Sequence, residues 1–241
     1  MQLGELKERW QLEPEAEYRC DRTLNLYKDP NQPGLVTQAA AHRSLKILTI
    51  DPTGLQVQLC SDGYPGWLRL TDSQALAPAT APYQPPTVHR HDIERAIPGA
   101  IAFTQAAMAV PNRYLWGGTV APHYDCSGLV QAAFASVGVP LPRDSYQQEA
   151  FTDAIDKSDL LPGDLIFFGT PERTTHVALY LDAGRYIHSS GKDQGRNGIG
   201  VDSIVDLAHP VSQTYAKQYR CCRRIMNGYK PQGLQPAGTV G

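Results

Sequence analysis

The chain has 241 residues, 41% of them hydrophobic, and a formal net charge of −2. This length accommodates two domains, each with a core of its own. The near-neutral charge argues against nucleic acid and against an anionic membrane surface as the main partner, and no apolar run approaches the ~20 residues of a membrane-spanning helix.

Residues 1–16 are polar and charged, and we expect them to form an arm ahead of the first domain. They contain no apolar stretch of the kind that forms the core of a secretory signal peptide. The five cysteines are an odd number at irregular spacing, which argues against a disulfide framework. Both observations favour a cytoplasmic protein.

Residues 17–76 alternate short apolar stretches with turn formers, which predicts a small β-barrel. One hairpin is clear, with strands over residues 47–50 and 55–59 joined by Asp51-Pro52-Thr53-Gly54. The region closes on Gly63-Tyr64-Pro65-Gly66-Trp67-Leu68. With this ending it resembles bacterial SH3-like domains, which often accompany cell-wall enzymes.

Two aromatic residues of this SH3-like region have different expected roles. Trp67 belongs to the strand pattern and is expected in the barrel core. Tyr64 lies in a loop bounded by glycine and proline, where an aromatic side chain is well placed to meet a ligand.

Residues 77–92 are rich in proline and alanine, and we expect an extended, semi-rigid linker there. The second domain then spans residues 93–229. It opens on a helix whose apolar face begins at Ile93, and Pro98-Gly99 is expected to break or kink this helix. Residues 230–241 are rich in glycine, proline and glutamine and are expected to form a flexible tail.

Cys126 stands where a loop gives way to an amphipathic helix. Apolar residues after it recur at the spacing of one helical face, and Gly138 with Pro140 ends the helix. Asp125 is placed to cap the first turn. The backbone N–H groups and the dipole of a helix start favour negative charge, so this position predicts a lowered thiol pKa. Taken alone, such a cysteine is more often a buried structural residue.

The rest of the second domain is rich in strand patterns. Residues 165–168 predict a buried strand, residues 175–181 and 185–190 predict two further strands, and residues 199–204 and 219–225 predict edge strands. Helices first and an antiparallel sheet afterwards make an α+β domain.

His176 and His188 each lie inside a predicted strand. A three-residue loop over residues 182–184, with Gly184 in the left-handed conformation, places Ala178 opposite His188. His188 then lies on the same sheet face as His176, one diagonal step of ~7–8 Å away, whereas a two-residue loop would put the two on opposite faces. Each histidine alone is as readily a satisfied core residue. Together, and with a helix-start cysteine earlier in the chain, they have the geometry of a thiol peptidase.

Several motifs follow in order between about residues 95 and 225. They are Tyr114-x-x-Gly117-Gly118, Asp125-Cys126-Ser127-Gly128-Leu129-Val130, Pro142-Arg143-Asp144-Ser145-x-x-Gln148, Leu161-Pro162-Gly163-Asp164-Leu165, His176-Val177-Ala178-Leu179-Tyr180 and Tyr186-Ile187-His188. This domain resembles the NlpC family of bacterial cell-wall cysteine peptidases. The resemblance implies an α+β, papain-like peptidase domain preceded by the small SH3-like β-barrel.

The resemblance also implies a reaction, which is hydrolysis of the bond between γ-D-glutamate and a diamino acid, typically meso-diaminopimelate, in peptidoglycan stem peptides. With an SH3-like domain in front and no signal peptide, the chain is most similar to members that trim murein peptides with a free N-terminal L-alanine. The expected partner is therefore a peptide of the L-Ala-γ-D-Glu-diaminopimelate type. No cofactor and no metal ion are expected.

With this resemblance, three catalytic roles follow. Cys126 attacks the carbonyl carbon as a thiolate, His176 carries the proton, and His188 fixes the tautomer of His176. The backbone N–H of Cys126 is expected in the oxyanion hole. The Tyr114 phenol either adds a donor there or packs against the helix, and the sequence leaves these two roles equal.

By resemblance, Asp125, Ser127, Asp144 and Ser145 line the pocket for the L-Ala-γ-D-Glu part of the substrate. From the residues alone they are helix caps and a turn. A free α-amine is a cation that needs a carboxylate or a ring of acceptors, and Asp144 is our first choice and Asp125 the second. Tyr64 is expected to close the end of the groove from the first domain.

Two other functions stay open. A papain-like amidase or acyltransferase would pass the thioacyl group to a nucleophile other than water. A non-catalytic wall-binding protein would use its SH3-like domain and would keep its function without Cys126. A zinc site is disfavoured, because Cys221 and Cys222 are adjacent and lack a second pair of ligands.

Overall fold

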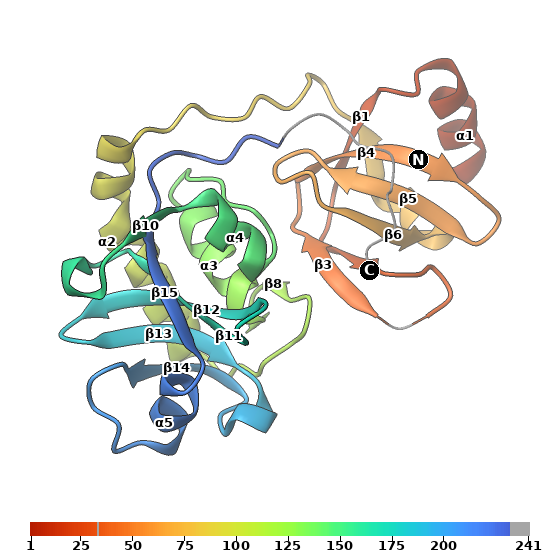
Figure 1. Cartoon of the computed structure of the whole chain (residues 1–241). Coiled ribbons are helices and arrows are strands. Elements are labelled where there is room, and N and C mark those ends of the chain that lie inside the picture. Colours follow the sequence, from red (N-terminus) through yellow and green to blue (C-terminus); the bar gives the residue numbers. More distant parts are fainter. Residues whose placement is uncertain (33, 232–241) are drawn as a thin grey trace. The chain divides into compact units, whose positions relative to one another are not determined.

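The structure, a computed structural model, describes residues 1–32 and 34–231 and divides into two compact units (Figure 1). One unit spans Met1–Pro85, with which Lys230 and Pro231 are grouped, and the other spans Pro86–Tyr229. Each unit has a hydrophobic core of its own. Of the predicted flexible tail, residues 232–241 lie outside the described residues.

The first unit is built on a seven-stranded antiparallel sheet with the order β3-β2-β6-β5-β4-β1-β7. Its strands are β1 Glu17–Cys20, β2 Leu24–Tyr27, β3 Leu35–Ala39, β4 Ser44–Ile50, β5 Gly54–Leu59, β6 Pro65–Arg69 and β7 Leu76–Pro78, with a 3₁₀ helix, η1 Leu70–Ala75, before β7. The predicted hairpin is confirmed, since β4 and β5 pair with Ile50 opposite Leu55. Trp67 is only half-buried, and its neighbour Leu68 fills the core instead, because successive strand residues face opposite sides.

The arm expected over residues 1–16 contains a helix, α1 Leu3–Leu12. Leu6 is fully buried in the core of the first unit, and the Trp10 indole N–H donates to the Ile47 carbonyl at 3.0 Å. Leu6 and Trp10 lie four positions apart on one helical face, a pattern that the charged residues around them obscure. This segment is therefore packed on the first unit and is not a separate arm.

The second unit packs helices against a six-stranded antiparallel sheet of order β10-β15-β11-β12-β13-β14. The helices are α2 Arg90–Ala109, α3 Cys126–Ala135, α4 Ser145–Phe151 and α5 Pro210–Ala216, with 3₁₀ turns η2 Lys157–Asp159 and η3 Lys192–Gln194. The strands of the sheet are β10 Asp153–Ile155, β11 Leu165–Gly169, β12 Thr174–Asp182, β13 Arg185–Ser190, β14 Gly198–Ser203 and β15 Tyr219–Arg224, and a separate hairpin joins β8 Thr119–Val120 to β9 His123–Tyr124. The predicted α+β fold is confirmed.

The limits of the linker and of the sheet differ from the prediction. β7 ends at Pro78 and α2 begins at Arg90, so the predicted linker over residues 77–92 loses residues at both ends to regular structure.

β14 is an edge strand as predicted, but β15 lies between β10 and β11. The missing neighbour is β10, whose three residues are too few to form a recognisable alternation.

Helix α2 runs through Pro98, so the break that was one of the two expected outcomes does not occur. Ile93, Ile97 and Ala100, on both sides of the proline, are buried in one core. This packing holds the helix together although a proline lacks the N–H of one helical hydrogen bond.

Over residues 1–32 and 34–231, we find no helix with both the length and the apolar character needed to cross a membrane.

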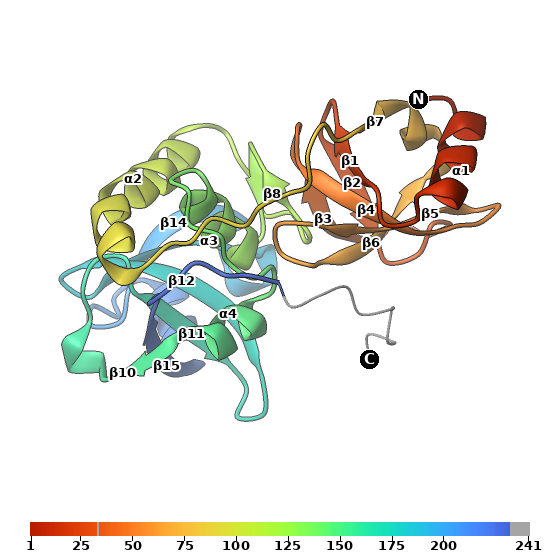
Figure 2. The ribbon, with the colours of Figure 1, turned by 90° about the horizontal axis from the view of Figure 1, so that it is seen from above.

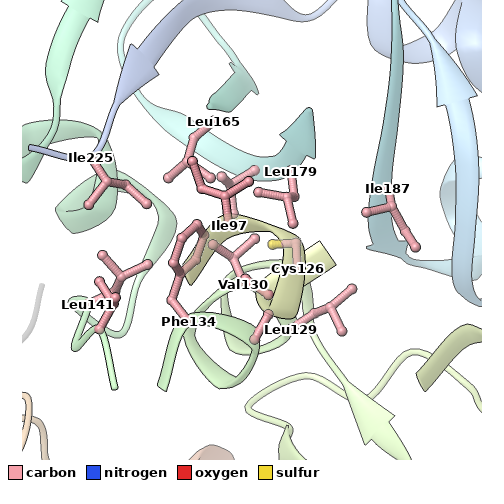
Figure 3. Packing of buried hydrophobic residues seen from close by; sticks show 14 of the residues in the cluster. Ile97, Cys126, Leu129, Val130, Phe134, Leu141, Leu165, Leu179, Ile187 and Ile225 are labelled. Carbon is pink, nitrogen blue, oxygen red and sulfur yellow. The ribbon is translucent and has the colours of Figure 1, made fainter. Parts of the chain in front are cut away.

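Helices α2 and α3 lie on one side of the six-stranded sheet (Figure 2), and α5 packs on the opposite face. Alternate strand residues serve the two faces, so Phe167 belongs to the core under α3 while Phe168 packs with α5. Figure 3 shows the core under α3, where Val130 lies among the strand residues Leu165 and Leu179. The sheet is thus buried on both faces around the segments that carry the predicted site.

Candidate active site

Cys126 is the first residue of α3, shortly after the β8–β9 hairpin, and its side chain is almost fully buried. Figure 3 shows it among the apolar side chains at the start of this helix. Gly128 allows the helix start to approach the preceding loop, because a Cβ there would lie 2.0 Å from the carbonyl oxygen of Gly118. This close contact explains the glycine two positions after the cysteine.

Asp125 caps α3 and is also one half of a buried ion pair. Its Oδ1 accepts the Gly128 N–H at 2.6 Å, and its Oδ2 accepts the Gly117 N–H at 2.9 Å. Arg143 adds a two-point contact, with Nη2 2.6 Å from Oδ2 and Nη1 3.2 Å from Oδ1, and Nη1 also donates to Ser127 Oγ at 2.9 Å. The predicted cap is confirmed. The part played by Arg143 was missed, because an arginine in a turn gives no sequence signal of burial.

Asp144 and Ser145 lie at the start of α4, which contacts α3. The Asp144 N–H donates to Gln147 Oε1 at 3.0 Å, and the Asp144 carboxylate accepts the Gln147 N–H in return. Gln148 Nε2 donates to the Ser127 carbonyl at 3.1 Å and so joins the two helix starts. Of the four residues expected to line the pocket, Asp144 alone is half-buried and the others are buried.

The two predicted histidines meet on one face of the sheet. His176 Nε2 and His188 Nδ1 are 2.7 Å apart, with the two rings nearly perpendicular. The side chains are buried, His188 completely. The pairing of Leu179 with Ile187 gives the register that the sequence argument required.

The turn that produces this register differs from the prediction. Asp182 pairs with Arg185, which leaves Ala183 and Gly184 as a two-residue loop with positive φ at both residues, 45° and 77°. A register shift between Tyr180 and Asp182 adds one residue to β12. This bulge compensates for the shorter loop, so the histidines still share a face.

The Asp202 carboxylate contacts the second histidine, His188, on the side away from His176. His188 Nε2 lies 2.8 Å from Oδ2 of Asp202, and Arg196 Nη2 lies 2.7 Å from the same oxygen. Asp202 is on β14, where the pairs Tyr186–Asp202 and His188–Gly200 put it one diagonal step from His188. Sequence reasoning missed this residue. The pairing of the strands over residues 185–190 and 198–203 was the signal that could have identified it.

Tyr215 of α5 covers both imidazoles. Its ring is stacked on His176, with centroids 4.4 Å apart, and meets His188 edge-on at 4.9 Å. Its hydroxyl lies 2.8 Å from Ser190 Oγ. The stacking restricts the orientation of the His176 ring. Sequence reasoning missed Tyr215, since nothing near it in the chain indicates that α5 packs on the histidine face.

Residues 111–224 match the NlpC/P60 family, and residues 26–72 match the bacterial dipeptidyl-peptidase SH3 domain. The chain carries an NlpC/P60 domain. The family predicted from the motifs around Cys126, His176 and His188 is therefore confirmed, as is the SH3-like domain that precedes it in the chain.

Proteins named as peptidases are among the relatives of this chain. The chain is 31% identical over 208 residues to the gamma-D-glutamyl-L-lysine dipeptidyl-peptidase of Bacillus cereus, covering 85% of this chain and 56% of that protein. It is 33% identical over 118 residues to the probable endopeptidase NlpC homolog of Haemophilus influenzae, covering 48% of this chain and 57% of that protein. A crystal structure of an NlpC/P60 family protein from Bacillus cereus matches with a TM-score of 0.45 at 24% identity, over 91% of this chain and 66% of that one. The chain spans little more than half the length of the two curated relatives.

The thiol of the NlpC/P60 domain is uncharged at rest. Burial, followed by the Asp125 carboxylate, raises the pKa of Cys126 to about 12, although the Val177 N–H and the Arg143 charge lower it. The lowering expected from the helix start is thus outweighed by the loss of water. The Val177 contact also places the thiol next to the backbone of His176, the preceding residue.

The histidines of the NlpC/P60 domain are uncharged as well. Burial, followed by the neighbouring His188, holds the pKa of His176 well below its usual value. Burial also lowers the pKa of His188, against the opposing effect of the Asp202 carboxylate. These pKa directions favour an uncharged thiol and uncharged imidazoles over a thiolate–imidazolium pair at neutral pH.

Tyr114 lies close to the thiol. Burial, followed by the charges of Cys126 and Asp125, raises the pKa of its phenol. The phenol therefore keeps its proton, the form in which it donates a hydrogen bond. Its side chain is half-buried, and the donor role and the packing role both stay predictions.

Tyr64, the remaining predicted site residue, belongs to the first unit. It is half-buried in the turn between β5 and β6, and its N–H donates to Asp62 Oδ1 at 3.0 Å. Arg43 Nη2 lies 2.5 Å from Oδ2 of the same carboxylate. The turn that presents Tyr64 is thus fixed to the barrel by Asp62.

Proposed function

We propose that this chain is a cysteine peptidase that cleaves the bond between γ-D-glutamate and a diamino acid in peptidoglycan stem peptides. The observation that carries the proposal is the 2.7 Å contact between His176 and His188 in an NlpC/P60 domain whose α3 begins at Cys126. A thiol nucleophile needs a base, and the base needs an orienting partner. The Bacillus cereus relative is named a gamma-D-glutamyl-L-lysine dipeptidyl-peptidase, and this name supports the choice of a γ-D-glutamyl bond.

The first half of the reaction forms a thioester. His188 engages Nε2 of His176, so Nδ1 is the nitrogen that takes the proton from the Cys126 thiol. The sulfur forms a bond to the carbonyl carbon, and the π electrons of the C=O bond move to the oxygen. When the C–N bond breaks, its electron pair stays on nitrogen and takes the proton from His176, so the diamino acid leaves as an amine.

The second half consumes one water molecule. His176 takes a proton from the water, whose oxygen bonds to the thioester carbon. The C–S bond then breaks, and the sulfur of Cys126 recovers the proton. The products are a carboxylic acid and an amine, with no oxidation or reduction.

The oxyanion of both tetrahedral intermediates needs donors at the start of α3. The backbone N–H of Cys126 is one, and the protonated phenol of Tyr114 is the second. Because the thiol and the imidazole are uncharged at rest, negative charge appears only as the bond to carbon forms. Donors fixed in place at that point lower the barrier without reorganising.

We assign the free α-amine of the N-terminal L-alanine to Asp144. This cation needs an anionic acceptor, and Asp144 is the half-buried carboxylate of the expected pocket residues. Asp125 comes second, because Arg143 already contacts both of its oxygens. The hydroxyls of Ser127 and Ser145 complete the set for the L-Ala-γ-D-Glu part.

Tyr64 belongs to the same proposal as the side chain that closes the groove against longer stems. Tyr64→Ala is expected to reduce the preference for L-Ala-γ-D-Glu-diaminopimelate over its N-acetylated form by about tenfold in kcat/KM. Tyr27→Ala, which alters an aromatic residue elsewhere in the first unit, serves as the matched control. An unchanged preference in Tyr64→Ala removes Tyr64 from the site.

The deciding assay incubates the chain in H₂¹⁸O with L-Ala-γ-D-Glu-meso-diaminopimelate, with its L-lysine analogue and with intact sacculi. Release of L-Ala-D-Glu carrying one ¹⁸O, together with the free diamino acid, is the expected result. Cys126→Ala abolishes it and Cys221→Ala retains it. Cleavage that persists in Cys126→Ala contradicts the proposal, and acyl transfer to an added amine in place of water favours the amidase or acyltransferase.

We include the predicted cytoplasmic location in this proposal. A peptidase in the cytoplasm would act on short stem peptides and not on the intact cell wall. Immunodetection in cytoplasmic and external fractions of producing cells tests it. If the chain is found mainly outside the cell, the intact cell wall becomes the expected substrate.

A further inference from the structure

Asp202 is a buried carboxylate that the three proposed catalytic residues leave without a role. Its side chain is 1% exposed, and its Oδ2 lies 2.8 Å from His188 Nε2 and 2.7 Å from Arg196 Nη2. Its Oδ1 lies 3.3 Å from both Ser212 Oγ and His209 Nδ1. One of the groups around this carboxylate is therefore the histidine that orients the base.

Asp202 is ionised. Burial opposes ionisation, but the hydrogen bonds and charges of His188 and Arg196 outweigh it and lower the pKa of Asp202 below its ordinary value. An ionised carboxylate only accepts hydrogen bonds. The hydrogen in the 2.8 Å contact therefore resides on His188 Nε2.

The same reasoning extends to the contact between the two rings. A neutral imidazole has one N–H, so His188, with its hydrogen on Nε2, offers Nδ1 as an acceptor. The hydrogen in the 2.7 Å contact then belongs to His176 Nε2. His176 is neutral too, which leaves a lone pair on Nδ1, the nitrogen assigned to take the thiol proton.

The opposite arrangement is the alternative that Asp202 excludes. If His188 carried its hydrogen on Nδ1, the two rings would keep an equally good hydrogen bond, but His176 would hold its hydrogen on Nδ1 and could not act as a base. In that arrangement the lone pair of His188 Nε2 would face the lone pairs of Asp202 across 2.8 Å. Arg196 also contacts Asp202 Oδ2 at 2.7 Å and opposes its charge, so the effect that we assign to Asp202 is the choice of tautomer.

We propose that Asp202 is a positioning residue that selects, through His188, the tautomer of His176 whose Nδ1 accepts the proton of Cys126. Its effect on turnover rests on the proposed function. The tautomers themselves are measured without substrate, so the two ideas can fail separately.

The direct test records ring ¹⁵N shifts of the full chain labelled with ¹⁵N-histidine, with signals assigned from His176→Gln and His188→Gln. Both rings of the unaltered chain are expected in the Nε2–H tautomer. Asp202→Asn is expected to move a measurable fraction of His176 to the Nδ1–H tautomer, because an amide can donate to His188 Nε2. An Nδ1–H tautomer of His176 in the unaltered chain, or unchanged tautomers in Asp202→Asn, overturns the inference.

Asp164→Asn is a matched control for the loss of a buried ion pair. Asp164 is also 1% exposed and holds Arg224 at 2.7 and 2.8 Å, next to the start of β11 and away from the histidines. Both substitutions are expected to lower the melting temperature. Only Asp202→Asn is expected to change the ¹⁵N shifts, and equal changes in both variants would show a merely structural role.

A double-mutant cycle tests the route of the effect. Asp202→Asn is expected to lower kcat by about 10- to 100-fold with little change in KM. In a His188→Gln background the same substitution is expected to cause no further loss, because Asp202 acts only through His188. An equal loss in both backgrounds overturns the inference. If no γ-D-glutamyl bond is cleaved while the ¹⁵N result holds, the substrate assignment falls and the role of Asp202 stands.

Discussion

The second unit holds a buried aspartate on each side of the proposed reaction, and each of them meets an arginine. Asp125, at the start of α3, accepts two contacts from Arg143 and two from backbone N–H groups. Asp202 lies next to His188, and its Oδ2 contacts both Arg196 and His188. The partners of Asp125 keep their protons throughout, so that carboxylate fixes a structure. A partner of Asp202 is an imidazole, so that carboxylate decides where a proton resides.

The two pairs also differ in burial. Arg143 is 1% exposed and Arg196 is 23% exposed. Water reaches the Arg196 guanidinium and screens its ion pair, whereas the Arg143 guanidinium is shielded, so the loss of Arg143 is expected to cost more, although Asp202 at 1% is less exposed than Asp125 at 9%. The arginine at the start of α3 is thus the more buried one, and the histidine face is the side whose protons can rearrange.

The largest expected effect concerns the thiol at the start of α3. Because burial and Asp125 raise the pKa of Cys126 to about 12, the thiolate fraction is small at neutral pH and grows with pH. Alkylation of Cys126 by iodoacetamide should rise about tenfold per pH unit, or about 10³-fold from pH 7 to pH 10. Cys126→Ala gives the background from other thiols. A flat rate between pH 6 and pH 8 would instead reveal a resting thiolate–imidazolium pair.

Removing each arginine compares the two pairs directly. Arg143→Met should lower the free energy of unfolding by about 3–5 kcal/mol, since it leaves a buried charge without its partner. Arg196→Met should lower it by about 1–2 kcal/mol, because His188 still donates to Asp202. Urea unfolding followed by circular dichroism measures both. Equal losses would erase the distinction between a structural and a proton-directing aspartate.

The smallest effect is expected for the phenol that borders the thiol. Tyr114→Phe should lower kcat by about 10- to 100-fold at nearly constant KM, because it removes one donor to the oxyanion. Tyr219→Phe removes the phenol that meets Cys222 on β15 and should leave kcat unchanged. If kcat is the same in Tyr114→Phe, Tyr114 serves only for packing, and the donors come from the α3 backbone alone.

The parts of the site that could be predicted depend on neighbours in the chain. Asp125 caps the helix that Cys126 begins, and both are visible as one motif with helical periodicity after it. The shared face of His176 and His188 follows from a hairpin register set within a few residues. That prediction succeeded although its turn was wrong, because the bulge in β12 compensated for the shorter loop.

The missed residues depend on elements that meet only in the fold. Arg143 reaches Asp125 across α3 and α4, and Asp202 reaches His188 through the pairing of β13 with β14. Tyr215 reaches His176 because α5 packs on that face of the sheet. No local pattern records these contacts, since none of the partners are neighbours in the sequence.

By itself, the sequence determined an SH3-like region, an α+β peptidase domain, a cysteine at a helix start and two histidines on one sheet face. The tertiary structure decided the protonation of that cysteine and the partner behind those histidines. It reversed the expected direction of the thiol pKa, because the field of a helix start is a local property whereas the loss of water depends on everything packed around the sulfur. For the same reason, the proton on His176 follows from Asp202, a residue that only the packed sheet brings within reach.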